Sequence, residues 1–242
     1  AGGSSGGSGA AASANFCTAA IGQEGFASIR RPSIWNGISG MRPTAGLVSR
    51  GGVYAGWPSI YGSLGPMARS VMDCAKLLDV MAGFDAEDPI TARGVGNQPD
   101  SYTGMLSADG LKGARLGVLR TVMGYHSEPD SDDFKQVDTV FNQAIADMQA
   151  AGAEIVDPLE IPNLNETLEK RAWDSLGDAE AFRAYCAGSA DAPFATMEEA
   201  MASPLYEQVC NGVTTRWANK STPEEYAAYQ KARGDFMTEV LA

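Results

Sequence analysis

A glycine- and serine-rich first third, residues 2–73, constrains the fold of this chain more than any other feature. It opens with the run Gly-Gly-Ser-Ser-Gly-Gly-Ser-Gly at residues 2–9 and leads directly into the alanine-rich, helix-forming residues 10–14. Glycines at a helix N-terminus leave backbone N–H groups free, and the positive end of the helix dipole can then hold an anion or an oxyanion. A flexible linker is the alternative interpretation, but the segment that follows has the composition of packed structure.

Short elements separated by turns are expected after this run. Residues 16–21 indicate a short buried strand or a helix end, and residues 22–27 a turn whose backbone N–H groups can point inward. Ser28 begins the segment Ser-Ile-Arg-Arg-Pro-Ser, which is typical of the first turn of a short helix. Arg30 and Arg31 are either partners of carboxylates or surface charges, and we favour structural pairing over catalysis.

Beyond residue 34 the chain alternates irregular and regular segments. Residues 35–66 predict tightly turned backbone close to a core, because glycines are frequent and charges are few. Helical spacing over residues 70–82 predicts a helix that ends at Gly83, and residues 84–109 predict a polar surface connection. The apolar face of that helix is expected to contain Val71, Ala75, Leu78 and Met81.

Residues 110–242 predict a strand–helix–strand unit followed by a helical, aromatic region on the substrate side. Strands at residues 114–119 and 153–157 flank a helix at residues 131–151, which Gly152 ends. An acidic cluster at the start of this helix is compatible with a calcium loop, but helix capping explains it more simply. The cluster consists of Glu128, Asp130, Asp132 and Asp133, and the apolar face of the helix of Phe134, Val137, Phe141, Ile145 and Met148.

Size and charge narrow the possible functions. With 242 residues, of which 44% are hydrophobic, the chain can form one large domain with a sizeable core. Its net charge of −12 argues against a nucleic-acid backbone or an anionic membrane surface as the main partner. No apolar run approaches the roughly 20 residues that a membrane helix needs. The chain starts without a Met or a secretory signal and ends in a helical pattern, so we expect a fragment of a longer protein.

Cysteine and histidine offer little chemistry. The four cysteines, at positions 17, 74, 186 and 210, form no Cys-x-x-Cys pair, so a zinc or redox motif is not expected. We interpret them as free and buried, with a Cys186–Cys210 disulfide as the alternative for an exported protein. The single histidine, His126, lies in a polar loop, which disfavours a Ser-His-Asp triad. A serine enzyme built on this chain therefore needs another base, and lysine is the common one.

Four blocks in order give the chain a resemblance to a known family. They are Gly2-Gly3-Ser4-Ser5-Gly6-Gly7-Ser8, Ser28-Ile29-Arg30, Gly40-Met41-Arg42-Pro43-Thr44 and Gly65-Pro66-Met67-Ala68-Arg69. In order and spacing they resemble the amidase signature family, which includes fatty acid amide hydrolase, malonamidase, peptide amidases and the A subunit of glutamyl-tRNA amidotransferase. The signature covers residues 1–75. The resemblance implies an α/β amidase-signature fold: one domain across residues 1–242 with a mixed central sheet covered by helices on both faces.

The resemblance also implies a serine-based site. It makes Ser28 the nucleophile that forms an acyl-ester intermediate. Ser4, 24 positions earlier, would lie on a cis peptide and relay the proton, and Ser5 would support the site by hydrogen bonding. Backbone N–H groups of Gly25, Phe26, Ala27 and Ser28 would form the oxyanion hole.

The chain departs from the family pattern at the catalytic base and in the residues just before Ser28. The family's base is a lysine upstream of the Gly-Gly-Ser-Ser block, so the catalytic lysine is not in this chain, which alone is expected to be inactive. The six lysines, at positions 76, 112, 135, 170, 220 and 231, all lie downstream. Where the family has Asp-x-Gly-Gly before the nucleophile, this chain has Glu24-Gly25-Phe26-Ala27. Phe26 and Ala27 tolerate positive φ poorly, which puts the geometry of the oxyanion hole in doubt.

We therefore predict hydrolysis of a small-molecule amide at a linear C–N bond, not peptide-backbone proteolysis, through a Ser-Ser-Lys triad. A glutamine amidotransferase of the A-subunit type and a non-catalytic homologue used for binding are the alternatives. No metal or organic cofactor, no nucleic-acid partner and no membrane segment are implied. A homodimer is compatible with the sequence, and the compartment is open, with the cytoplasm preferred.

Overall fold

A computed structural model describes residues 2–53, 62–124, 130–169, 175–204, 206 and 222–241. The chain divides into two compact units, residues 1–105 with 171–231 and residues 106–170 with 232–242. That one amidase domain spans residues 1–242 stays a prediction. Several residues considered above lie outside the described ranges: His126, Glu128, Lys170, Cys210 and Lys220. Cys17, Cys74 and Cys186 are free thiols.

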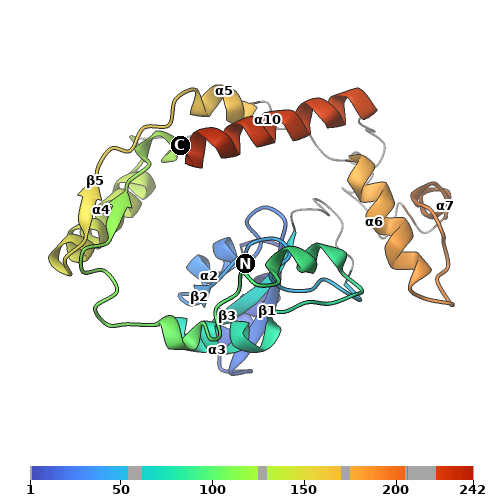
Figure 1. The fold of residues 1–242 in the computed structure, drawn as a ribbon, viewed down its shortest axis with the longest axis horizontal. Coiled ribbons are helices and arrows are strands. Elements are labelled where there is room, and N and C mark those ends of the chain that lie inside the picture. The colour runs from blue at the N-terminus through green and yellow to red at the C-terminus, as the bar shows by residue number, and fades with distance from the viewer. Residues whose placement is uncertain are drawn as a thin grey trace. The chain divides into compact units, whose positions relative to one another are not determined.

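The first unit is built around a three-stranded antiparallel sheet in the order β1-β3-β2 (Figure 1). Its strands are β1 (Ala19–Glu24), β2 (Ser39–Gly40) and β3 (Ser63–Ala68). The register places Gly22 opposite Gly65 and Glu24 opposite Ser63. The expected turn at residues 22–27 therefore begins later, at Gly25, because Gly22 to Glu24 pair with β3 instead.

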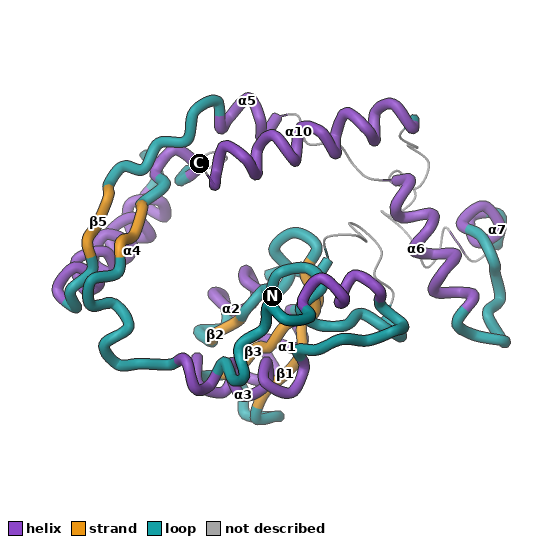
Figure 2. Tube along the Cα trace, in the orientation of Figure 1, coloured by secondary structure: helices purple, strands orange, loops and turns teal. Residues whose placement is uncertain are grey.

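Three helices accompany this sheet: α1 (Gly6–Ser13), α2 (Arg30–Trp35) and α3 (Val71–Met81), all visible in Figure 2. The helix expected after the opening glycines is confirmed but begins earlier, so that Gly6, Gly7 and Gly9 lie inside it. Phe16, which the sequence assigns to a short buried strand or to a helix end, is 85% exposed. It lies in a turn that contains Asn15 at φ 64°, three residues before β1, so the alternation of strand side chains does not reach it.

Helix α3 matches the helix expected at residues 70–82. Its first turn is capped by Ser70, whose side chain accepts a hydrogen bond from the Asp73 backbone N–H. Cys74, Ala75 and Leu78 are buried, whereas Val71, in the first turn, is exposed. The connection after α3 contains η1 (Pro89–Gly94) and η2 (Thr103–Met105), and it is not all surface, because Asp88 and Thr91 are buried.

Among the described residues, the first unit also contains α6 (Ser175–Ala187), α7 (Met197–Met201) and the first part of α10 (Pro223–Leu241). A small core joins α6 and α7. Met197, Ala200 and Tyr206 are buried in it, with Phe182, Phe194 and Met201 packed against them. The helical, aromatic character expected after Glu166 is confirmed for the described residues.

The second unit contains the expected strand–helix–strand motif. Strands β4 (Arg115–Gly117) and β5 (Glu154–Val156) pair in parallel, and α4 (Asp132–Ala150) connects them. Short helices η3 (Arg120–Val122) and α5 (Leu164–Glu169) and the last part of α10, from residue 232, also belong to this unit. Ser131 caps α4 by accepting a hydrogen bond from the Phe134 N–H, with Asp132 and Asp133 in the first turn, so the described part of the acidic cluster serves helix capping. On the expected apolar face Ile145 is buried, whereas Val137 is 65% exposed.

Candidate active site

Ser28 lies between the end of β1 and the first turn of α2, and it is half-buried. The residue after it, Ile29, is fully buried. A Cβ added to Gly22 would lie 2.8 Å from Cγ1 of Ile29, and one added to Gly65 would lie 3.1 Å from its Cδ1. The facing glycines of β1 and β3 thus leave the space that the Ile29 side chain occupies, and this contact fixes Ser28 at the surface of the sheet.

Glu24, the last residue of β1, holds the backbone that follows Ser28. Its side chain is fully buried, and Oε2 accepts hydrogen bonds from the backbone N–H groups of Ile29 at 2.8 Å and Arg30 at 3.0 Å. Oε1 accepts one from Nε of Arg30 at 2.7 Å. Nε of Arg42 lies 3.7 Å from the same oxygen. The buried carboxylate is therefore neutralised by two arginines and replaces a helix cap for α2.

These contacts settle the expectation for the arginines. Arg30 is the partner of a buried carboxylate, as structural pairing predicts, and Arg31 is exposed. The partnership of Glu24 with Arg42 was missed, because the two residues are 18 positions apart. One sequence signal could have revealed this pair: Glu24 is the single acidic residue just before the expected oxyanion turn, and the arginines at positions 30, 31 and 42 follow it.

The segment Gly2–Ser5 reaches Ser28 from the other side. The backbone N–H of Ser5 donates to the carbonyl oxygen of Ser28 at 3.3 Å, and a Cβ added to Gly3 would lie 3.4 Å from Cα of Ser28. The buried Ser5 side chain exchanges two hydrogen bonds with the backbone of Gln23, accepting from its N–H at 3.0 Å and donating to its carbonyl at 3.2 Å. The structure therefore brings together the Ser4–Ser5 and Ser28 segments that the sequence singled out. Ser4 itself is exposed.

The turn at Ser4 differs from the expectation in one respect. Among the described residues the cis peptide bond is Asp157–Pro158, so the bonds on either side of Ser4 are trans. Instead, Gly2 at φ 104° and Gly3 at φ 142° make the turn. These are conformations that a residue with a Cβ rarely adopts, which accounts for two glycines in a row.

The loop from Gly25 to Ser28 contains no residue with positive φ. Among the other described non-glycine residues, only Asn15 and Asn163 have positive φ. The side chains of Phe26 and Ala27 therefore cause no strain of the kind expected from the family pattern. In the described part of the chain, the backbone N–H groups of Gly25, Ala27 and Ser28 donate no hydrogen bond to another protein group. The Phe26 carbonyl accepts a hydrogen bond from Arg30 at 2.8 Å, which fixes the loop from its outer side.

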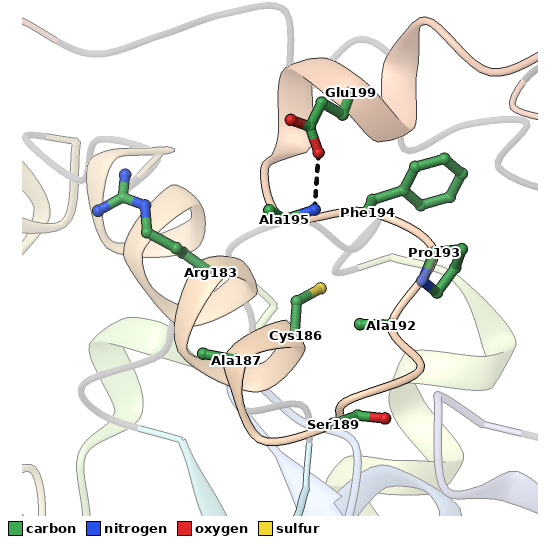
Figure 3. A pocket seen from close by; sticks show the side chains of 9 residues that line it. All are labelled: Arg183, Cys186, Ala187, Ser189, Ala192, Pro193, Phe194, Ala195 and Glu199. Carbon is green, nitrogen blue, oxygen red and sulfur yellow. Dashed lines mark hydrogen bonds between the residues drawn. The ribbon is translucent and has the colours of Figure 1, made fainter.

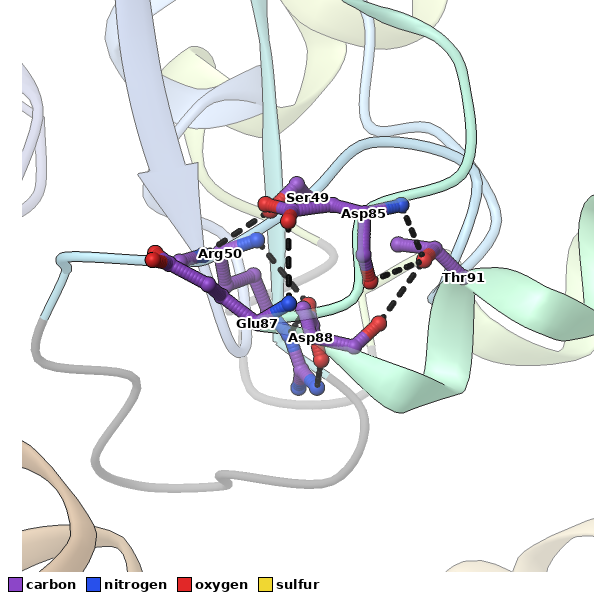
Figure 4. A network of polar contacts seen from close by, with 7 residues as sticks. Ser49, Arg50, Asp85, Glu87, Asp88 and Thr91 are labelled. Atoms are coloured by element: carbon purple, nitrogen blue, oxygen red, sulfur yellow. Dashed lines mark hydrogen bonds and ion pairs between the residues drawn. The ribbon is translucent and has the colours of Figure 1, made fainter.

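A second polar network, which sequence reasoning missed, holds the turn after Val48 (Figure 4). The Arg50 guanidinium donates to both carboxylate oxygens of Asp88, at 2.8 Å each, and the Arg50 N–H donates to Oδ2 at 2.9 Å. The hydrogen bonds from Arg50 hold the pKa of Asp88 below its ordinary value. Ser49 likewise donates to Asp85, which lowers the pKa of that carboxyl group. The network ties residues 49–50 to residues 85–91.

A cavity of about 410 Å³ lies between α6, the loop after it and α7 (Figure 3). At its rim the Glu199 carboxylate accepts a hydrogen bond from the Ala195 N–H at 2.7 Å. None of its lining residues belongs to the predicted site: they are Arg183, Cys186, Ala187, Ser189, Ala192, Pro193, Phe194, Ala195 and Glu199. Across the described ranges, no group of three or more His, Cys, Asp or Glu side chains is arranged to hold a metal ion. No helix in those ranges is long and apolar enough to cross a bilayer.

Fold and site together define an α/β protein in which two serine-bearing segments meet on a glycine-lined sheet. The chain belongs to the Amidase family, whose model matches residues 1–240. Solved structures agree, and the fold is the amidase-signature fold. An amidase family protein from Bacillus anthracis superimposes with a TM-score of 0.78 at 25% identity, covering 98% of this chain and 46% of that one. The peptide amidase from Stenotrophomonas maltophilia gives 0.71 at 30% identity, covering 96% and 47%.

Among curated proteins, the A subunit of glutamyl-tRNA(Gln) amidotransferase from Zymomonas mobilis is 38% identical over 180 residues, which is 74% of this chain and 34% of that protein. Its counterpart from Neisseria gonorrhoeae is 39% identical over the same length. The chain thus spans about a third of the length of the curated relatives it matches.

Proposed function

We propose that the protein hydrolyses the C–N bond of a small carboxylic amide, with Ser28 as nucleophile and an acyl-enzyme intermediate. The observation that carries the proposal is the meeting of the Ser5 N–H with the Ser28 carbonyl at 3.3 Å, which places the Ser4 segment beside Ser28. Membership of the Amidase family supports the same chemistry. Ser4 relays the proton, and Ser5 supports the site through its bonds to Gln23.

The reaction follows from these roles. A neutral lysine, which the family pattern places upstream of Ser4, takes a proton from the Ser4 hydroxyl, and Ser4 takes one from Ser28. The Ser28 oxygen attacks the amide carbonyl carbon, and the tetrahedral intermediate collapses as the C–N bond breaks. The proton returns through Ser4 to the leaving nitrogen. Water then attacks the ester at Ser28, which releases the acid and restores the serine.

Charge in the intermediate is stabilised by backbone donors of the Gly25–Ser28 loop, three of which make no other protein hydrogen bond within the described ranges. One such donor typically contributes on the order of 2.7–4 kcal/mol to lowering the barrier. A bare carboxylate at Glu24 would oppose a developing oxyanion nearby. Its pairing with Arg30 at 2.6 Å and with Arg42 at 3.7 Å reduces that repulsion, so the buried charge is compatible with catalysis.

The test is to treat the intact protein with a fluorophosphonate and to map the adduct by mass spectrometry. We expect one adduct, on Ser28, and loss of both adduct and amide turnover in Ser28→Ala. Ser107→Ala makes the same change at an exposed serine in the other unit and is expected to leave both unchanged. A folded protein without an adduct on Ser28, or a Ser28→Ala variant with the original rate, would refute the assignment.

A second candidate is the A-subunit role, in which the same site releases ammonia from glutamine. The names of the curated relatives favour it, since they are A subunits of glutamyl-tRNA(Gln) amidotransferase. Activity on glutamine that needs tRNA and a partner protein, with none on simple amides, would support it. The third alternative, a non-catalytic homologue, rests on Phe26 and Ala27. It loses weight because the loop carries both without positive φ.

A further inference from the structure

The segment before Ser4 lies along α2, close to one aromatic side chain and to the backbone of Pro32. A Cβ added to Gly2 would lie 2.9 Å from Cε3 of Trp35 and 2.9 Å from Cα of Pro32. One added to Gly3 would lie 3.7 Å from Cδ of Pro32, in addition to its approach to Ser28. Gly2 is thus held between the Pro32 backbone and the Trp35 indole, and Gly3 continues toward the nucleophile.

We infer that Trp35 is a positioning residue for Ser4, holding the Gly2–Ser4 segment against α2 so that the Ser4 hydroxyl stays beside Ser28. The inference rests on the proposed function. Two consecutive glycines with positive φ form a segment with little intrinsic rigidity, so outside contacts must fix it. On the C-terminal side Ser5 is fixed by its three hydrogen bonds to Ser28 and Gln23. On the N-terminal side Trp35 and Pro32 supply the contact.

The exposure of Trp35 supports this role. Its side chain is 63% exposed, so most of the indole contributes nothing to the core of the unit. The end of α2 that carries Trp35 is fixed independently of the indole. Nδ2 of Asn36 donates to the Pro32 carbonyl at 2.7 Å, and the Ser13 hydroxyl donates to the Asn36 carbonyl at 2.8 Å. Removing the indole therefore leaves α2 in place and takes away one of the two contacts that hold Gly2.

The chemistry predicts which rate should change. Ser4 delivers a proton to the leaving nitrogen, and an amide cannot release its amine without that proton. A nitrophenolate leaves without protonation, so an activated ester needs Ser4 only to take the proton from Ser28, whereas an amide needs both proton transfers. A displaced Ser4 should therefore slow amide hydrolysis more than hydrolysis of a p-nitrophenyl ester, whereas general damage to the site should slow both alike.

The experiment compares Trp35→Ala, Trp35→Phe and Ile34→Ala in the intact protein. Ile34 is the neighbouring residue on α2 and is 76% exposed, which makes it the matched control. For Trp35→Ala we expect kcat on an amide to fall at least about tenfold with KM nearly unchanged, because misplacement by about 1 Å can cost a hundredfold. The p-nitrophenyl ester rate should fall less than about threefold, and Trp35→Phe should restore most of the amide rate. Ile34→Ala should behave like the unchanged protein.

The ester rate also reports whether Trp35→Ala has folded. An equal loss on ester and amide, a change confined to KM, or an unchanged amide rate would each overturn the positioning role. Fluorophosphonate labelling distinguishes a failure of the inference about Trp35 from a failure of the proposed function. If Ser28 is labelled and Ser28→Ala is inactive while Trp35→Ala is unaffected, only the inference about Trp35 fails. If Ser28 is not labelled in the unchanged protein, the proposed function fails and the role of Trp35 fails with it.

Discussion

Glu24→Gln tests whether the buried carboxylate holds the backbone that follows Ser28. The amide has the same shape but no charge, and only one of its two terminal atoms can accept. In the structure both oxygens accept: Oε2 from the N–H groups of Ile29 and Arg30, and Oε1 from the Arg30 side chain. In either orientation the NH2 group of the introduced glutamine would therefore face donors. The variant must then lose either the hydrogen bonds from the two backbone N–H groups or the one from the Arg30 side chain.

The expected loss follows from these contacts. A hydrogen bond to a charged group contributes about 1.5–3 kcal/mol, and breaking a buried ion pair costs about 3–5 kcal/mol. The Arg30 side chain is 57% exposed, so water can solvate the freed guanidinium, and the range for a charged hydrogen bond applies instead of the range for a broken buried ion pair. We expect the free energy of opening the first turn of α2 to fall by about 2–3 kcal/mol, that is, about 30- to 160-fold faster amide exchange, since 1.36 kcal/mol is a factor of ten.

Hydrogen exchange with mass spectrometry on overlapping peptides across residues 25–36 measures this directly. Glu87→Gln, the same change at an exposed glutamate of the same unit, is the control and should leave these peptides unchanged. Acceleration of less than about threefold in Glu24→Gln would contradict the reasoning, because the carboxylate would then contribute under about 0.7 kcal/mol.

Two further predictions concern other parts of the first unit. The hydrogen bonds from Arg50 lower the pKa of Asp88. The stabilisation is therefore present above the pKa of an unfolded Asp, about 3.9, and is lost as the pH falls through the lower native pKa. In an acid titration of unfolding, Asp88→Asn should be less stable at neutral pH and less sensitive to pH below about 4. An Asp88→Asn variant with an unchanged acid profile would refute this. In Gly65→Ala the new methyl group meets the Met41 carbonyl and lies 3.1 Å from Cδ1 of Ile29, so we expect a loss of about 3 kcal/mol in thermal or urea unfolding; retention of full stability would show that β3 can shift.

Local patterns predicted the elements of this fold well. Helical spacing located α3 and α4, and the strand–helix–strand motif of the second unit has the expected parallel pairing. Burial of individual residues was predicted less well, because a periodic pattern does not show where an element begins. Phe16 precedes β1 by three residues, and Val71 lies in the first turn of α3, so neither is packed as expected.

At the candidate site, the order of the motif blocks predicted that the Ser4 and Ser28 segments meet. The sequence could not reveal what holds them, because the contacts join distant residues. Glu24 meets Arg42 across 18 positions, and Arg50 meets Asp88 across 38. The positive φ that the family pattern suggested for Phe26 and Ala27 is absent for a related reason. A family pattern shows that glycines occur in the loop, whereas the φ values show that this loop does not require them.

The absence of left-handed backbone from the Gly25–Ser28 loop has a consequence for protein engineering. Position 26 lies two residues before Ser28, and Phe26 is 50% exposed. Its hydrogen bond with Arg30 uses the backbone carbonyl, which every amino acid provides. If Ser28 is the nucleophile, as proposed, a saturation library at residue 26 samples acyl-group selectivity from a partly exposed position beside it.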